Sequence, residues 1–100
     1  MVLMVTRRLL DEGDFDAWKT RFEAQSEVRK AAGCRGIRRM RGVENPRELV
    51  VIFDWDTIEN AKAFVGIKTS EKPELLEDRE DAAAPKLDIV FVEEMPPLES

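Results

Sequence analysis

The sequence predicts an α+β protein built on a four-stranded antiparallel sheet with two long helices on one face. Segments with strand and helix periodicity follow one another in the order strand, helix, strand, strand, helix, strand. The chain has 100 residues, which suits a single domain. Several of the strand segments are apolar on both faces, although so short a chain has few residues left to cover a second face.

The first third of the chain reads as a strand followed by a helix. Residues 2–9 are β-branched and apolar, and DEGD ends this strand. Asp14 is a candidate N-cap for a helix that runs to residue 32, and Gly33 suits the left-handed position after a helix. The apolar residues of this helix recur near helical spacing and are Phe15, Trp18, Phe22 and Val28.

The middle of the chain predicts a hairpin and a second helix. Residues 34–43 form a weaker strand rich in glycine and arginine, and the turn ENPR joins it to the apolar strand 48–55. Asp56 or Thr57 caps the helix that follows. One face of that helix is apolar and carries Ile58, Ala61, Phe64 and Val65.

The last third predicts a short extra helix before the final strand. Pro73 suits its first turn, Leu75 and Leu76 give it an apolar contact, and Pro85 ends it. Residues 86–95 are the last strand. We therefore expect one domain over residues 1–95 and a C-terminal tail over 96–100.

This element order is that of the split βαβ, or ferredoxin-like, arrangement βαββαβ. Right-handed crossovers place both long helices on one face of the sheet. The strand ELVVIFDW directs Val50 and Ile52 to the other face. A second copy of the chain is the simplest cover for that face, so the sequence predicts a homodimer formed by sheet-to-sheet packing.

Composition argues against several classes of partner. The net charge of −5 and the pI near 4.8 argue against nucleic acid, and ELVVIFDW lacks the basic and glycine positions of an RNA-recognition strand. The sequence has no apolar run of membrane-spanning length and no signal-peptide pattern, so no membrane partner is expected. The single cysteine, Cys34, favours a reducing, cytoplasmic location.

Four segments together carry a family resemblance, namely GDFDAWKTRF, KAAGCRGIRRMR, NPRELVVIFDWDTIENAKAF and DIVFVEEM. The chain resembles, over nearly all of residues 1–95, the dimeric α/β-barrel superfamily in its antibiotic biosynthesis monooxygenase-like branch. The resemblance implies a homodimer with a cavity between each sheet and its helices. It also implies a choice among cofactor-independent oxygenases, haem-degrading enzymes, small cyclases and isomerases, and members of unknown role.

Histidine and tyrosine are both absent from the chain. Their absence removes the usual general base at neutral pH and excludes a Ser-His-Asp or Cys-His arrangement. The haem-degrading members of the family that the chain resembles hold iron through a histidine. This chain has none, so we expect no haem here. The EDRED run has neither the spacing nor the glycine of a metal loop. We therefore expect neither a metal nor another cofactor.

The aromatic residues Trp18, Phe22 and Trp55, with Phe64 and Phe91, form either the lining of an apolar pocket between sheet and helices or simply the core. Asp54 is the one acid inside an apolar strand. It is either a buried base with a raised pKa or a strand-end residue that caps or pairs with an arginine.

The arginines of CRGIRRMRG also allow two interpretations. Arg38 lies on the opposite strand face from Arg39 and Arg41, and it is a candidate for bidentate recognition of an anionic or carboxylate ligand at the cavity. The alternative is that these charges protect an edge strand and pair with Glu and Asp residues.

Three functions remain open at this point. The first is binding of a small apolar or aromatic molecule between sheet and helices, with Trp55, Trp18, Phe22, Arg38 and Asp54 as candidate ligand-binding residues. The second, which rests on the resemblance, is a cofactor-independent monooxygenase or cyclase acting on an aromatic or polyketide-like substrate. The third is a non-catalytic dimerisation module.

Overall fold

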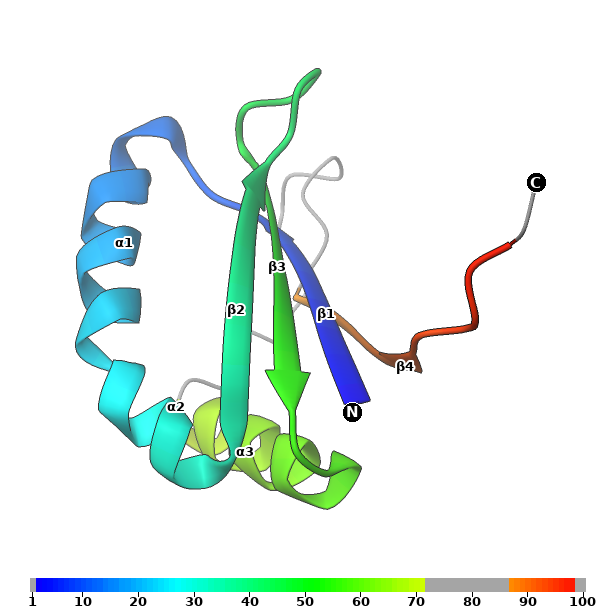
Figure 1. Ribbon diagram of the computed structural model, residues 1–100. Coiled ribbons are helices and arrows are strands. Elements are labelled where there is room, and N and C mark those ends of the chain that lie inside the picture. The colour runs from blue at the N-terminus through cyan, green and yellow to red at the C-terminus, as the bar shows by residue number, and fades with distance from the viewer. Residues whose placement is uncertain (1, 72–86, 99–100) are drawn as a thin grey trace.

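A computed structural model describes residues 2–71 and 87–98 (Figure 1). The elements follow the predicted order, and the first and third strands have the predicted bounds. The predicted short helix after Pro73 lies outside the described residues. The elements are β1 (Val2–Leu9), the 3₁₀ turn η1 (Glu12–Asp14), α1 (Phe15–Ala24), α2 (Ser26–Ala32), β2 (Cys34–Arg41), β3 (Glu48–Trp55), α3 (Ile58–Glu71) and β4 (Asp88–Glu93).

The four strands form one antiparallel sheet in the order β2-β3-β1-β4. The register pairs Phe53 with Met4 on one side and with Ile37 on the other, and it pairs Met4 with Phe91. Residues paired in this way share one face of a sheet. This topology is the ferredoxin-like arrangement that the element order predicts.

Helices α1 and α3 pack on the same face of the sheet, as the right-handed crossovers require (Figure 1). The ring of Phe22 in α1 lies 6.0 Å from that of Phe53, and the ring of Phe64 in α3 lies 5.3 Å from that of Trp55. Phe53 and Trp55 are two residues apart on β3 and so point the same way. We call this side of the sheet the helix face.

The helix predicted over residues 15–32 is in fact two helices that meet at Gln25. The backbone of Gln25 leaves helical geometry, with φ −93° and ψ 8°, and its N–H donates to the carbonyl of Phe22. The predicted apolar stripe is also wrong at its C-terminal end. Val28 is 51% exposed, whereas Arg29 is only 5% exposed and points inward with the aromatic residues of α1.

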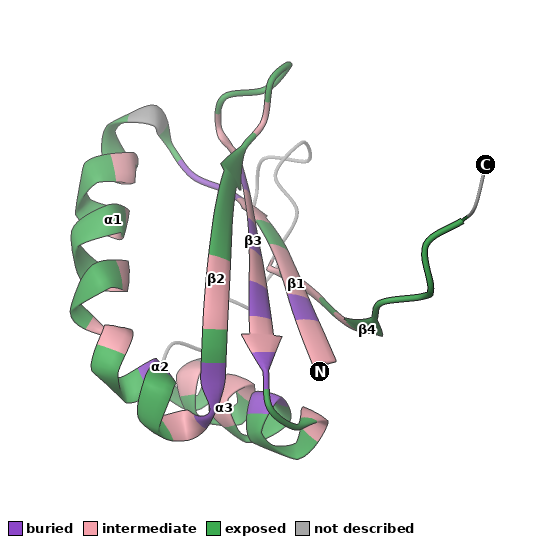
Figure 2. Cartoon of the chain, viewed as in Figure 1, coloured by how far each residue is buried: buried purple, intermediate pink, exposed green. Residues whose placement is uncertain are grey.

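The core lies between the sheet and the helices and is centred on β3 (Figure 2). Every second residue of β3 is buried, and Trp55 is fully enclosed. The buried apolar residues are Met4, Leu9, Leu10, Cys34, Leu49, Val51, Phe53, Trp55 and Ala61.

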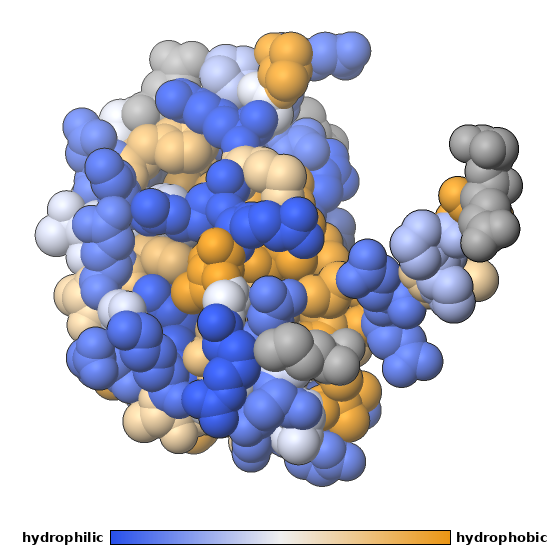
Figure 3. All heavy atoms as spheres, viewed as in Figure 1, coloured by the Kyte–Doolittle hydropathy of each residue, from blue (hydrophilic) through white to orange (hydrophobic). Residues whose placement is uncertain are grey.

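The opposite side of the sheet, which we call the open face, is also apolar. Hydrophobic residues reach the surface over the strands in Figure 3. Val90 is 53% exposed and Met40 is 42% exposed, which is unusual for side chains of this size within a sheet. The register assigns to this face Leu3, Val5, Met40, Val50, Ile52, Val90 and Val92.

Gly33 joins α2 to β2 in a backbone conformation that favours glycine, with φ at 115°. Its N–H donates to the carbonyl of Lys30, which closes the helix, and its carbonyl accepts from the N–H of Asp56. A side chain at position 33 would collide with the carboxylate of Asp56. Of the two predicted caps of α3, Asp56 and Thr57, the structure has Thr57, because its Oγ1 accepts from the N–H of Asn60 at 3.1 Å.

We expect Gly33→Ala to lower the free energy of unfolding by about 2 kcal/mol, since it combines a left-handed backbone with a steric clash. Gly66→Ala is the matched control. A Cβ at position 66 meets nothing within 4 Å inside α3, so this change should raise stability by roughly 0.5–1 kcal/mol. Urea denaturation of both variants measures the two effects, and equal values would contradict this account of Gly33.

Candidate functional site

A groove of about 210 Å³ lies between α1 and the end of β2. Phe15 and Trp18 line it from α1, Leu49 lines it from β3, and Arg39 and Arg41 line it from β2. The aromatic residues recur at helical spacing on the side of α1 that faces the sheet. The two arginines are two residues apart on β2, so both reach the helix face.

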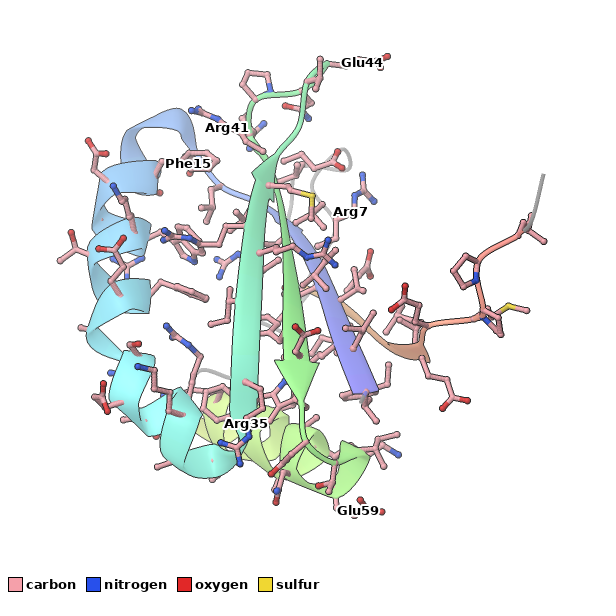
Figure 4. The ribbon with its side chains drawn as sticks, in the orientation of Figure 1. Arg7, Phe15, Arg35, Arg41, Glu44 and Glu59 are labelled. Carbon is pink, nitrogen blue, oxygen red and sulfur yellow. The ribbon has the colours of Figure 1, made fainter. Side chains whose placement is uncertain are left out.

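Arginine side chains cover the aromatic rings of this groove. Phe15 and Arg41 lie side by side in Figure 4, with the guanidinium carbon 4.1 Å from the ring centroid. The guanidinium carbon of Arg39 is 5.9 Å from the Trp18 ring, and the same group pairs with Glu23 at 3.4 Å. The groove therefore combines flat apolar surfaces with planar cationic donors.

Arg29 is the one buried charged residue in the described part of the chain. Its guanidinium carbon lies 3.9 Å from the centroid of the Phe22 ring, and its Nε has no hydrogen-bond partner. Burial lowers the pKa of Arg29 from its ordinary value, and the neighbouring charge of Arg39 lowers it further. The sequence analysis missed Arg29, although its place seven residues after Phe22, on the same side of the helix, was a usable signal.

A second cavity, of about 170 Å³, lies between α2 and the beginning of β2. Arg29, Lys30 and Arg35 line it together with the buried thiol of Cys34. Burial raises the pKa of Cys34 from its ordinary value, while its contact with the Gly36 carbonyl, at 3.5 Å, lowers it to a smaller extent. The thiol is therefore mainly protonated at neutral pH.

The structure brings two of the predicted ligand-binding residues together. The rings of Trp18 and Phe22 lie 4.8 Å apart on the helix face, and Trp18 lines the groove. Trp55 lies on the same face but is fully buried against Phe64 and lines neither cavity. Its indole Nε1 has no hydrogen-bond partner.

The other two predicted residues, Arg38 and Asp54, lie on the open face. The register pairs Arg38 with Ile52 and Asp54 with Leu3, so both side chains point away from the helices. The register therefore places Arg38 on the side of the sheet away from the helices, and its role as a ligand-binding residue stays a prediction. Asp54 lies beside Gly36, where a Cβ would approach its carboxylate to 2.9 Å, and it lines neither cavity.

Arg35 and Arg39 behave as the edge-strand interpretation expects, whereas Arg41 stacks on Phe15 and donates its Nε–H to the carbonyl of Pro46. β2 is an edge strand, and Arg35 pairs with Asp56 at 3.5 Å, as Arg39 does with Glu23. Such exposed pairs contribute at most about 1 kcal/mol each. Within residues 2–71 and 87–98, no three His, Cys, Asp or Glu side chains gather in a way that could hold a metal ion.

No helix among the described residues has the length and apolarity needed to cross a membrane.

Comparisons with known proteins identify the family to which the chain belongs. A family model described as antibiotic biosynthesis monooxygenase matches residues 1–69. The chain belongs to this family, as the resemblance in its sequence suggested. No curated protein matches the chain significantly in sequence.

Three solved structures illustrate how widely this fold is shared. A Deinococcus radiodurans protein assigned to the antibiotic biosynthesis monooxygenases is 12% identical, with a TM-score of 0.66 and coverage of 100% of this chain and 98% of that one. The heme degrader MhuD from Mycobacterium tuberculosis, with two hemes bound, is 15% identical, with a TM-score of 0.65 and coverage of 99% and 100%. A dimeric ferredoxin-like protein from an uncultured marine organism is 12% identical, with a TM-score of 0.59 and coverage of 99% and 97%.

We expect Cys34 to react slowly with iodoacetamide in the native protein, because the thiol is buried and its pKa is raised. At pH 8, alkylation should be roughly tenfold or more slower than in the chain unfolded by guanidinium. Mass spectrometry of timed samples measures both rates. Native alkylation as fast as that of the unfolded chain would show that the thiol is accessible.

Proposed function

We propose that this protein binds a small planar aromatic molecule in the groove between α1 and β2. The observation that carries the proposal is the pairing of Phe15 and Trp18 on one wall with Arg39 and Arg41 on the other. Aromatic faces and guanidinium planes both stack on flat rings. A ligand that enters the groove would displace the arginine side chains from the rings of Phe15 and Trp18 and stack its own ring there.

The arginines also favour a ligand that carries polar oxygens. A guanidinium donates in a rigid planar fork, which matches carboxylate, phenolate or carbonyl oxygens at the edge of an aromatic ring. The volume of about 210 Å³ is below the usual range of roughly 300–1,000 Å³ for drug-sized ligands. These dimensions support a ligand of a few fused rings at most.

A second candidate function is a cofactor-independent monooxygenase or cyclase acting on an aromatic substrate, and membership of the family favours it. The chain has no histidine, and Asp54 lies on the open face. The substrate would be a phenol acidic enough to release its proton to water, and Arg39 would stabilise the phenolate. Consumption of oxygen by the protein in the presence of such a phenol would support this function. Binding of the phenol without oxygen consumption or product formation would support the ligand-binding function.

We also propose that two copies of the chain pair through their open faces. The face has an apolar centre, and polar groups surround it, among them Arg38, Asp54 and the pair Arg7–Glu48 at 3.0 Å. This distribution is typical of protein interfaces. The dimeric state of the marine ferredoxin-like protein supports this proposal.

Ligand binding in the groove should quench Trp18 and leave Trp55 unchanged, because only Trp18 lines the groove. We expect Trp55→Phe, which keeps Trp18, to lose fluorescence with at least one of salicylate, 2-hydroxy-1,4-naphthoquinone and 1,8-dihydroxyanthraquinone. Trp18→Phe, which keeps Trp55, should not respond. The melting temperature of the wild type should rise with occupancy of the same compound.

Lauric acid serves as the flexible, non-aromatic contrast in the same titrations. If none of the three aromatic compounds alters the fluorescence or the melting temperature, the groove is side-chain packing and the dimerisation module becomes the better account. If quenching persists in Trp18→Phe, the ligand binds near Trp55, and the proposed location is wrong.

The dimer proposal predicts that sedimentation equilibrium at micromolar concentration gives about twice the 11.5 kDa chain mass. Ile52→Asp should shift the protein to monomer or unfold it, because it places a charge at the centre of the open face. Val28→Asp is the matched control, since Val28 is apolar and exposed on α2, away from this face. A wild type that sediments as a monomer, or equal dissociation of both variants, would refute this mode of pairing.

A further inference from the structure

The second cavity, between α2 and the beginning of β2, is lined mainly by basic side chains. Arg29, Lys30 and Arg35 contribute to its wall, and no carboxylate does. Two of the three already have a carboxylate, because Lys30 pairs with Glu27 at 3.6 Å and Arg35 pairs with Asp56 at 3.5 Å. Among the described residues, Arg29 has no carboxylate within pairing distance.

Arg29 differs from the other two bases in its burial as well as in its lack of a partner. Its exposure is 5%, its Nε has no hydrogen-bond partner, and its described contact is the ring of Phe22. A buried charge without a partner costs free energy, and so does a buried donor without an acceptor. Burial and the neighbouring charge of Arg39 both lower the pKa of Arg29, so the folded chain holds this cation at a cost.

We propose that this cavity is a binding site for a small oxyanion, such as a carboxylate or phosphate group, with Arg29 as its main donor. An oxyanion there would lie against the guanidinium group of Arg29 and neutralise its buried charge, with Lys30 and Arg35 adding attraction from the rim. The volume of about 170 Å³ is that of about five or six water molecules in the liquid. It suits a compact anion better than a larger molecule.

This site is distinct from the aromatic groove. The two cavities have no lining residue in common, and Phe22, which Arg29 covers, lines neither. The anion site therefore does not depend on the aromatic ligand proposed above. Either proposal can fail while the other holds.

Inorganic phosphate and acetate are the two probes, one tetrahedral and one planar, each compared with chloride at equal ionic strength and pH. We expect a saturable rise in the melting temperature of the wild type at millimolar concentrations of at least one of them. The Nε–H signal of Arg29 in a ¹⁵N NMR spectrum should shift over the same concentration range. A preference between the two probes would indicate whether the natural ligand carries a phosphate or a carboxylate.

Arg29→Met is the decisive variant, because methionine keeps an apolar stem against Phe22 and removes the charge. It should abolish the anion-specific rise in melting temperature. In chloride alone, it should be at least as stable as the wild type, since it removes an unpaired buried cation. Arg21→Met is the matched control, because Arg21 is an exposed base on α1 that lines neither cavity, and this variant should retain the full anion response.

Three results would overturn the proposal. The first is a wild type whose melting temperature and Arg29 signal are the same in phosphate, acetate and chloride. The second is an Arg29→Met chain that melts well below the wild type in chloride, because Arg29 would then be a structural brace on Phe22. The third is an anion response of equal size in Arg29→Met and Arg21→Met, because that is a general salting-in or salting-out effect.

Discussion

The structure depends on one constraint, which is that the central strand β3 is apolar on both of its faces. Leu49, Val51, Phe53 and Trp55 point to one side, and all four are buried. Helix α1 packs on Phe53 and helix α3 packs on Trp55, so this row of side chains positions both helices. Val50 and Ile52 point to the other side and remain only partly covered within one chain.

The two faces of the sheet therefore have different uses. On the helix face, α1 is held off β2 by a layer of aromatic rings, and arginines fill the space around them. The groove lies within this layer, between the rings of α1 and the guanidinium groups of β2. On the open face, the side chains of β1, β3 and β4 form a continuous apolar surface, which is the usual mark of a contact with another molecule.

Arginine has three roles on these surfaces. Arg7 and Arg35 form exposed ion pairs, which contribute little to stability. Arg41 packs its guanidinium on an aromatic ring at the edge of the groove. Arg29 is enclosed without a counter-charge, and its contact with the Phe22 ring leaves the buried Nε without an acceptor. Departures of this kind from the rule that buried charges are paired often mark a functional position.

The sequence by itself determined the fold, because strand and helix periodicity, the Gly33 and Thr57 signals and the right-handed crossover rule all lead to one topology. It also identified Trp18 and Phe22 as neighbours. Only the tertiary structure decided which face each remaining candidate occupies. The strand pattern alone could not say whether Arg38 and Asp54 face the helices, since that depends on a register set by pairing with distant strands. The break at Gln25 was likewise beyond the sequence. Helical spacing from Phe22 indicated the side of the helix on which Arg29 lies, but a local helix pattern does not specify that a charged residue there is enclosed against Phe22.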